Sequence, residues 1–263
     1  RKIYYFLSPD MRIFARKLVY FPIDFFENIF GKKTEKIPNK GDIFIGSGDF
    51  IAQGKHHLEL LKTYANMQPN HHVLDIGSGI GRTACALKNY LSKTAIYHGF
   101  DVVEKGVIWC QKNISEDFPN FQFKYTPLNN DLYFLTDKKA EQFTFPYPDN
   151  SFDTVYLFSV FTHMQPLEVQ NYLNEINRVL KPSGKCLSTF FVYHTENENF
   201  ISKDNGTYIF PFKKEGYRLM NEKVPSANIA FDESFLNQML FNSGLKLSQK
   251  IDGNWKDKTQ VSH

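Results

Sequence analysis

The sequence contains few cysteines and no long hydrophobic run. Its 263 residues include three cysteines, and none of them forms a CxxC motif or lies in a Cys/His cluster. This scarcity argues against a disulfide-stabilised scaffold and against a metal site. No run approaches the ~18 apolar residues that a membrane-spanning helix needs, and no segment resembles a signal peptide. We therefore expect buried thiols in a reducing compartment and a cytoplasmic protein.

The chain also lacks a strong excess of charge. Its 31 Lys and Arg residues and 28 Asp and Glu residues give a net charge of +3, which is too weak to indicate a nucleic-acid partner. The phosphate-binding motif GxxxxGK[ST] is missing as well. Because the chain begins at Arg1 and stops soon after Trp255, we expect a fragment, a processed form or a trimmed version of a longer chain.

Residues 1–40 predict a helical extension followed by a basic linker. Ser8 and Pro9 are typical of a helix start, and Pro22 is expected to begin a second helix that stops at Gly31. Apolar residues recur at helical spacing on both sides of Pro22: Met11, Phe14, Leu18, Phe21, Ile23, Phe26, Ile29 and Phe30. Two interpretations stay open: helices that pack on the main domain, or a substrate lid or peripheral membrane contact formed by residues 1–33.

From residue 41 onward, expected strands alternate with expected helices. The strands are residues 71–76, 95–100, 121–125, 152–158, 185–193 and 245–251. The helices are residues 50–66, 80–91, 103–118, 166–180 and 232–242. This alternation predicts an α/β domain over residues 41–263, with a mostly parallel sheet and insertions near residues 127–150 and 194–227. Ligands of such sheets bind at the carboxyl ends of the strands.

Three glycines follow the first of these strands at alternate positions. The motif is GxGxG, formed by Gly77, Gly79 and Gly81. Because glycine has no Cβ, a ligand can approach the backbone of this turn closely. A dinucleotide-binding turn would need a further glycine at the place of Arg82. The turn therefore predicts a cofactor site, and its spacing argues against a dinucleotide.

Two acidic residues at the ends of neighbouring strands narrow the choice of cofactor. Asp75 precedes the glycine turn and suits a cationic group such as an ammonium. Asp101 ends the next strand, where an acid commonly binds ribose hydroxyls; capping of the following helix is the alternative. A ligand with a ribose and a cationic part, without a diphosphate, fits S-adenosylmethionine.

Four segments resemble motifs of the class I S-adenosylmethionine-dependent methyltransferases, most closely those of bacterial small-molecule enzymes. They are VLDIGSGIGR at 73–82, GFDVV at 99–103, PDNSFDTVYLFSVFTHM at 148–164 and RVLKPSGK at 178–185. Each is only moderately specific, but four in the same order are a strong indication. The resemblance implies a doubly wound, Rossmann-like sheet of seven strands, with S-adenosylmethionine as cofactor and S-adenosylhomocysteine as product.

The resemblance also implies roles for single residues. Gly77, Ser78 and Gly79 would pass beneath the methionine part of the cofactor, Asp75 would face its ammonium group, and Asp101 would bind the ribose. The other cofactor-binding residues that it implies are Gly81, Arg82, Val102, Leu128, Asn129, Phe158 and Ser159. Of these, Val102 would pack on the adenine. The family often has an Asp after the third strand, where Pro127 stands here, so the partner of the adenine amine stays open.

His163 is the candidate catalytic residue. It lies between the fourth strand and the next helix, where the resemblance places the methyl acceptor, and a histidine can take a proton from a hydroxyl. A structural histidine that bonds a loop carbonyl is the alternative. Aromatic residues in the two insertions are expected to form core and to line part of an acceptor pocket, and Lys213 and Lys214 either meet an anionic substrate or are solvated.

A second glycine turn, at residues 46–50, precedes the helix with His56 and His57. It is interpreted as an anion-binding helix start, as a lid, or as a plain helix cap with Asp49 near the start. We expect these two histidines to lie on a face of the helix that is either exposed to solvent or packed against the protein.

We interpret the chain as an enzyme that moves a methyl group from S-adenosylmethionine to an oxygen, or less readily a nitrogen, of a small molecule. Sugars, lipid-like compounds and natural products all remain open as acceptors. A nucleic-acid acceptor is disfavoured because the motif [DN]PP[YFW] does not follow the fourth strand. Two alternatives are a nicotinamide-dependent oxidoreductase, against which Arg82 argues, and a non-catalytic cofactor-binding module.

Overall fold

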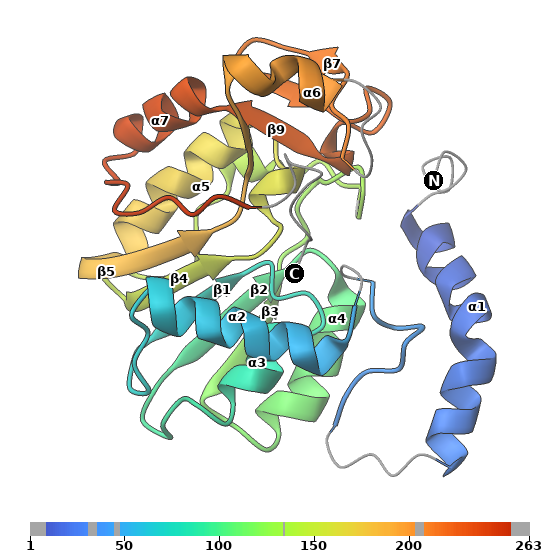
Figure 1. Cartoon of the computed structure of the whole chain (residues 1–263). Helices are drawn as coiled ribbons and strands as arrows, with labels where there is room; N and C mark the ends of the chain where they lie inside the picture. The colour runs from blue at the N-terminus through green and yellow to red at the C-terminus, as the bar shows by residue number, and fades with distance from the viewer. Residues whose placement is uncertain (1–8, 31–35, 45–47, 134, 203–207, 254–263) are drawn as a thin grey trace. The chain divides into compact units, whose positions relative to one another are not determined.

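A computed structural model describes residues 9–30, 36–44, 48–133, 135–202 and 208–253 (Figure 1). The chain forms two compact units, residues 1–127 and residues 128–263. Each unit holds its own helices and strands, and each is described separately below. The first contains the predicted glycine turn, and the second contains His163.

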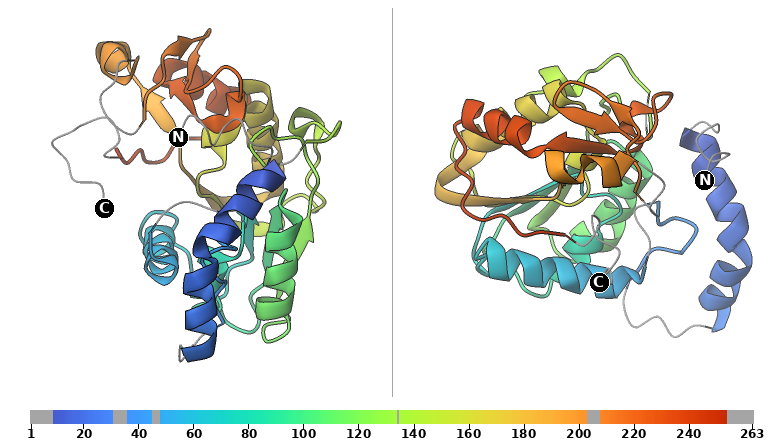
Figure 2. Two further views of the ribbon diagram at one scale, coloured as in Figure 1. Left: turned by 90° about the vertical axis from the view of Figure 1, so that its right-hand side faces the viewer. Right: turned by 45° about the horizontal axis from the view of Figure 1, so that its top comes forward.

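The first helix, α1, spans Pro9–Phe30 without a break (Figures 1 and 2). The prediction of two helices separated at Pro22 is therefore wrong. Proline in a helix interior removes one backbone hydrogen bond and costs about 3 kcal/mol, but its fixed φ is helical, so the helix continues when its other turns are stable. The predicted cap residue Ser8 lies outside the described residues.

Three parallel strands form the sheet of the first unit. They are β1 (Val73–Ile76), β2 (Tyr97–Asp101) and β3 (Phe121–Tyr125), and β2 pairs with both of the others. The register places Asp75 opposite Gly99 and Asp101 opposite Tyr125. All four residues of β1 are buried, as expected of a strand in a parallel sheet.

The helices of this unit are α2 (Phe50–Tyr64), α3 (Arg82–Leu87) and α4 (Glu104–Cys110). Helix α4 continues as a π-helical turn over Gln111–Ser115. The contacts join α2 with α3, and α4 with β2 and β3. Each expected helix is thus present, but α3 and α4 are shorter than the apolar pattern predicted.

In the second unit, β4 (Phe152–Leu157) pairs in parallel with β5 (Leu180–Ser188). Helix α5 (Pro166–Val179) connects them. It begins with a capping box, in which Gln165 and Glu168 bond each other's backbone N–H groups, and with a proline in its first turn. A 3₁₀ turn, η4 (Phe161–His163), lies between β4 and α5.

A second sheet has the strand order β6-β9-β8-β7. Its strands are β6 (Phe191–Tyr193), β7 (Phe212–Lys213), β8 (Tyr217–Leu219) and β9 (Ile229–Asp232). Tyr193, Ile201, Phe210 and Ala230 form a buried cluster beside it. The segment that we expected to be an irregular insertion thus contributes strands and core, together with α6 (Glu198–Ser202) and the short 3₁₀ turn η6 (Pro225–Ala227). The last helix, α7, spans Glu233–Asn242.

The mostly parallel sheet has five strands in the order β3-β2-β1-β4-β5, so the fold is the predicted α/β type. The family resemblance implies seven strands, and two of the strands expected from the sequence differ from the described structure. The expected strand 185–193 is divided between β5 and β6, which belong to different sheets. The expected strand at 245–251 is not formed, and residues 245–253 have no regular structure.

Candidate functional site

The glycine turn after β1 has the conformation that its composition requires. Gly77, Gly79 and Gly81 have φ values of 78°, 58° and 78°, a region that residues with a Cβ rarely adopt. The backbone N–H groups of Gly77 and Ser78 donate to the carbonyl oxygen of Phe100 at 2.9 and 3.1 Å. The turn is therefore bonded to the end of β2, and Gly81 caps helix α3.

The carboxylate of Asp101 is bonded to this turn. Its Oδ2 accepts from the backbone N–H of Gly79 at 2.7 Å, and its Oδ1 accepts from the backbone N–H of Val103 at 2.8 Å. The side chain is buried, and burial raises its pKa to about 6. Each carboxylate oxygen can accept a second hydrogen bond, so the bond to Val103 is compatible with the predicted contact to ribose hydroxyls.

Asp75 is also buried, and it has a partner that sequence reasoning missed. The hydroxyl of Tyr97 donates to Oδ2 of Asp75 at 2.5 Å. Tyr97 begins β2, and its ring stacks on Phe121 with 4.6 Å between the centroids. The sequence carried no signal for this pair, because the register of two parallel strands decides which side chains meet.

Besides Oγ of Ser115 in the π-helical turn, two buried hydroxyls near strand ends of this unit have no hydrogen-bond partner among the described residues. They are Oγ of Ser78, in the glycine turn, and Oγ1 of Thr126, directly after β3. A buried polar atom of this kind ordinarily has a hydrogen-bond partner, which a bound ligand or an ordered water can supply. These hydroxyls follow the carboxyl ends of β1 and β3, so their placement fits a polar cofactor at the predicted edge of the sheet.

Two further glycines keep the turn closely packed. A Cβ at Gly106, in α4, would lie 2.4 Å from the carbonyl oxygen of Gly79, and one at Gly99 would lie 2.9 Å from Cβ of Ser78. Both positions therefore require glycine for close approach. Sequence reasoning missed Gly106, because a single glycine within a helix pattern gives no sign of what it contacts. Val102 lies between β2 and α4, as predicted.

Arg82 begins α3 and is buried, with its guanidinium 5.8 Å from the centre of the Phe50 ring. Burial lowers its pKa. His57 lies on the neighbouring helix α2, where its Nδ1 is 2.8 Å from Oγ1 of Thr83. Burial, together with the charge of Arg82, lowers the pKa of His57 to about 4. His57 is thus packed and uncharged, whereas His56 is exposed.

The second glycine turn ends in a helix cap. Asp49 is the N-cap of α2, and its carboxylate accepts from the backbone N–H of Ala52 at 2.7 Å. This bond supports the plain capping interpretation at that end of the turn. Gly46 and Ser47 lie outside the described residues.

In the second unit, His163 ends the turn η4 and contacts the turn η6. Its Nδ1 is 2.8 Å from the carbonyl oxygen of Ser226, and burial lowers its pKa. The ring of Tyr133 packs edge-on against it, with 5.9 Å between the centroids. Because a carbonyl oxygen only accepts, Nδ1 carries the hydrogen, and in the neutral ring Nε2 is the basic nitrogen. The bond to a loop carbonyl that the structural alternative for His163 expects is thus present.

The segment after β4 has an unusual backbone. Ser159 has φ 58°, although it is not a glycine, and its N–H donates to Oγ1 of Thr189 at 2.8 Å. Phe158 precedes it, with its ring centre 5.5 Å from that of Tyr156. A left-handed serine between a strand end and a turn is a strained position of the kind that occurs at ligand sites.

The other predicted residues of the second unit are Leu128 and Asn129. Leu128 is buried. Asn129 donates its backbone N–H to the carbonyl oxygen of Lys138 at 2.7 Å, and its side-chain oxygen accepts from the N–H of Thr136 at 3.2 Å. Asn129 is therefore bonded within its own insertion, and its role in cofactor binding stays a prediction.

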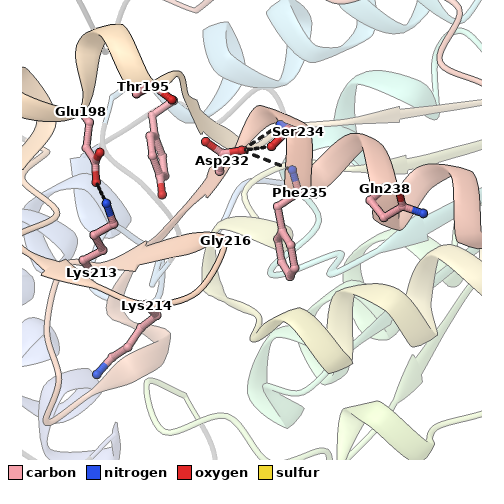
Figure 3. Close-up of a pocket in the computed structure, with 10 residues that line it drawn as sticks. Thr195, Glu198, Lys213, Lys214, Gly216, Asp232, Ser234, Phe235 and Gln238 are labelled. Carbon is pink, nitrogen blue, oxygen red and sulfur yellow. Dashed lines mark hydrogen bonds and ion pairs between the residues drawn. The ribbon is translucent and has the colours of Figure 1, made fainter.

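A pocket of about 600 Å³ lies beside the second sheet (Figure 3). Lys213 and Lys214 line it, and they pair with Glu198 and Glu222, each at 2.8 Å. The carboxylate of Asp232, also in the lining, caps α7. The two lysines are thus engaged in ion pairs. Of the aromatic rings in the insertions, Phe145 and Phe210 are buried as core, whereas Tyr208 and Phe212 are exposed.

No group of three or more potential metal ligands occurs among the described residues. Within the same residues, no helix has both the length and the apolar character to cross a membrane.

The sequence matches a family model described as methyltransferase domain over residues 74–188. A ubiquinone/menaquinone biosynthesis C-methyltransferase of Rickettsia akari is 32% identical over 159 residues, which cover 58% of this chain and 58% of that protein. A tRNA N(3)-cytidine methyltransferase of Bos taurus is 24% identical over 178 residues, covering 63% of this chain and 44% of that protein. A solved structure, a Pyrococcus horikoshii protein at 18% identity, superimposes with a TM-score of 0.53 and covers 81% of this chain and 86% of its own.

The chain spans less than two thirds of the length of these curated relatives. Their named substrates differ in chemistry, and one of them is a tRNA. The prediction that excludes a nucleic-acid acceptor therefore has no support from the relatives. The likeness to the solved structure agrees with the predicted fold.

Proposed function

Residues 74–188 form a class I S-adenosylmethionine-dependent methyltransferase domain, and from that premise we propose that the chain transfers the methyl group to an oxygen atom of a small molecule. Transfer to nitrogen is the second choice. The observation that carries the choice of oxygen is the hydrogen bond from Nδ1 of His163 to the carbonyl oxygen of Ser226, 2.8 Å long. That bond leaves Nε2 as the basic nitrogen when this partly buried ring is neutral, and a neutral histidine can take a proton from a hydroxyl.

For the cofactor, we propose that the first unit supplies the binding residues. Gly77, Ser78 and Gly79 would contact the methionine part, and the carboxylate of Asp75 would balance its ammonium group. The free lone pairs of Asp101 would accept from the ribose hydroxyls. The buried hydroxyl of Ser78 supports this assignment, because a polar ligand would satisfy it.

The same proposal assigns Gly81 and Arg82 to the start of the helix behind the turn, and Val102 to the adenine. The family resemblance implies four further cofactor-binding residues, and we propose the same role for them: Leu128, Asn129, Phe158 and Ser159. In each case the supporting fact is the position of the residue after a strand of the parallel sheet.

When bound, S-adenosylmethionine supplies a methyl carbon that is activated by its sulfonium. In the proposed step, Nε2 of His163 would accept the proton of the acceptor hydroxyl, whose oxygen would take the methyl group that the bound cofactor supplies, with S-adenosylhomocysteine as the second product. Alignment of the reactants supplies much of the acceleration in such displacements, and a positioned base adds about 10²–10⁴-fold. An alcohol benefits from this base more than an amine or a thiol does.

The test is incubation of the protein with S-adenosylmethionine that carries a deuterated methyl group. A metabolite extract and a total RNA fraction are offered in separate reactions, and products are read by mass spectrometry. Label on an oxygen of a small molecule is the expected result, and fragmentation distinguishes an oxygen from a nitrogen linkage. Label in RNA alone would overturn the small-molecule acceptor without affecting the domain assignment.

Calorimetric titration with S-adenosylhomocysteine and with NADH separates the cofactor classes. We expect binding of the first and not of the second, because Arg82 stands where a dinucleotide turn needs glycine. Binding of S-adenosylhomocysteine without turnover on any acceptor would favour the non-catalytic module.

A further inference from the structure

Helix α1 contacts its own unit through a charged face. Nζ of Lys17 pairs with Asp42 at 2.7 Å. The carboxylate of Asp24 accepts from the backbone N–H groups of Lys40 and Gly41 at 2.7 and 2.8 Å. Positions 17 and 24 are seven residues apart and so lie on one side of the helix. The side of α1 that contacts residues 40–42 is therefore polar.

The contact on this side is close as well as polar. A Cβ at Gly41 would lie 2.9 Å from Oδ2 of Asp24 and 3.2 Å from Cα of Lys17. The next turn of α1 adds an ion pair between Glu27 and Lys40 at 2.5 Å. The charged face of α1 thus rests directly on the segment around residue 41.

A different side of α1 presents large apolar side chains to solvent. The exposed fractions are 63% for Phe14, 61% for Leu18, 64% for Phe21, 50% for Phe25 and 56% for Ile29. Steps of three and four residues place them in one stripe, and Leu18 and Phe25 lie about 100° around the helix from Lys17 and Asp24. An amphipathic helix of a globular protein usually turns such a stripe to the core. Here the arrangement is inverted, and contiguous exposed apolar surface of this kind marks an interaction site.

The charge of the surrounding sequence distinguishes between occupants of this stripe. Residues 1–40 contain nine Lys and Arg residues and four Asp and Glu residues, whereas acidic residues are slightly in excess over the remainder of the chain. A second copy of the same helix would bring two basic segments together. An anionic lipid surface complements both the apolar stripe and the basic residues.

We propose that α1 (Pro9–Phe30; blue in Figures 1 and 2) is a membrane-surface helix that binds anionic lipid with the stripe Phe14–Leu18–Phe21–Phe25–Ile29. At 1.5 Å per residue its 22 residues are about 33 Å long. The described helices include none that could span a bilayer, so α1 lies along the interface, with its aromatic rings at the boundary between headgroups and acyl chains. The proposal does not depend on the identity of the methyl acceptor.

The experiment is co-sedimentation of the whole chain with vesicles of phosphatidylcholine alone or with phosphatidylserine added. We expect binding to the anionic vesicles, weakened by salt because part of the attraction is electrostatic. The triple variant Phe14→Gln, Leu18→Gln, Phe21→Gln should lose at least about tenfold in partitioning, since each change removes apolar surface from the lipid contact.

A matched control carries three similar changes at apolar residues that are equally exposed on the other unit. Leu135→Gln, Leu167→Gln and Phe241→Gln alter side chains with exposed fractions of 66%, 69% and 78%, and this variant should bind vesicles as the parent does. Both variants should bind S-adenosylhomocysteine like the parent, which shows that they are folded.

Two results would overturn the proposal. One is equal sedimentation of the parent and the stripe variant with anionic vesicles. The other is a parent dimer in sedimentation velocity that the stripe variant dissociates while vesicle binding is absent, because the stripe would then be an interface between copies of the chain.

Discussion

The backbone N–H of Gly79 donates to Oδ2 of Asp101 at 2.7 Å, so the acid that ends β2 bonds the glycine turn that follows β1. The second oxygen of the same carboxylate accepts from Val103, at the start of α4. The side chain of Asp101 thus holds both the glycine turn and the start of α4, at the end of the sheet where we expect the cofactor. Its proposed contact with ribose would use positions that these bonds leave open.

Replacement of Asp101 by Asn should weaken S-adenosylhomocysteine binding by at least about tenfold, because an amide has one oxygen where the carboxylate has two acceptors. Binding by the parent should also weaken as the pH falls through about 6, the pKa of the buried carboxyl. Protonation converts one accepting oxygen into a donor. Calorimetry over a pH series measures both effects, and the Asn variant should lack the pH-dependent step.

The pH dependence of Asp101 can be separated from unfolding by its sign. Burial raises the pKa of this carboxyl above its ordinary value, so its ionisation destabilises the fold as the pH rises through about 6 and not as it falls. Weaker binding below that pH therefore does not reflect loss of the fold through Asp101. Asp117→Asn, a change at an exposed carboxylate that pairs with Lys36, is the control, and an equal effect there would contradict the prediction.

Replacement of Gly106 by Ala should weaken cofactor binding although alanine favours helix. The new Cβ would lie 2.4 Å from the carbonyl oxygen of Gly79, so the glycine turn or α4 must shift. The gain in helix propensity is about 1 kcal/mol. We expect a loss of about tenfold or more in affinity for S-adenosylhomocysteine, of the size that displaced binding groups produce. The control is Ile108→Ala, on the exposed side of α4, which should leave the affinity unchanged. Normal affinity in the Gly106 variant would show that the turn does not require close packing against α4.

Replacement of His163 by Asn keeps a side-chain donor for the carbonyl of Ser226 but removes the base. If His163 takes the acceptor proton, kcat should fall by about 10²–10⁴-fold with little change in the KM for S-adenosylmethionine. The pKa of His163 is lowered by burial, so activity of the parent should fall only on the acid side of the ordinary histidine range. The Asn variant should not show this loss of activity at low pH. A drop of only a few-fold in kcat would favour the structural role.

Replacement of Glu168 by Gln should stabilise the protein at alkaline pH. Oε2 of Glu168 accepts from the backbone N–H of Gln165 at 2.7 Å in the capping box of α5, and Gln can fill the same role. Burial raises the pKa of Glu168 from its ordinary value of 4.5 to about 7, so the stability of the fold decreases as the pH rises from 4.5 through about 7 and levels off above that. The variant should gain on the order of 1 kcal/mol well above pH 7.

Urea unfolding at pH values on both sides of 7 measures the Glu168 effect. Glu59→Gln, at an exposed residue that pairs with Lys62, should show no comparable change with pH. A gain for the Glu168 variant that is equal at all pH values would mean that the ionisation of this carboxyl is not its cause.

The sequence predicted the first unit well because its signals are local. The apolar run of β1 and the glycines after it identify a strand and a turn, and both are present. The pairing of Asp75 with Tyr97 could not be predicted, because it depends on the register between two strands that are far apart in the chain. The role of Gly106 could not be predicted for a similar reason. Glycine is required at this position only because α4 packs directly on the glycine turn.

Predictions failed where tertiary contacts override a local signal. Pro22 was expected to end a helix, yet α1 continues through it while Lys17 and Asp24 on either side are bonded to the segment near residue 41. The expected strand 185–193 is divided, because its second half pairs with β9 in another sheet. Neither outcome is encoded in the residues of the segment itself.

The left-handed backbone of Ser159 restricts which amino acids that position can accept over evolution. A residue with a Cβ pays about 1–2 kcal/mol in this conformation, and β-branched residues pay most. Glycine, asparagine and aspartate are the replacements that the conformation admits, whereas valine, isoleucine and threonine are not. Related sequences should therefore have only serine, glycine, asparagine or aspartate at position 159. This should hold even where the methyl acceptor, and with it the residues near the end of β4, have changed.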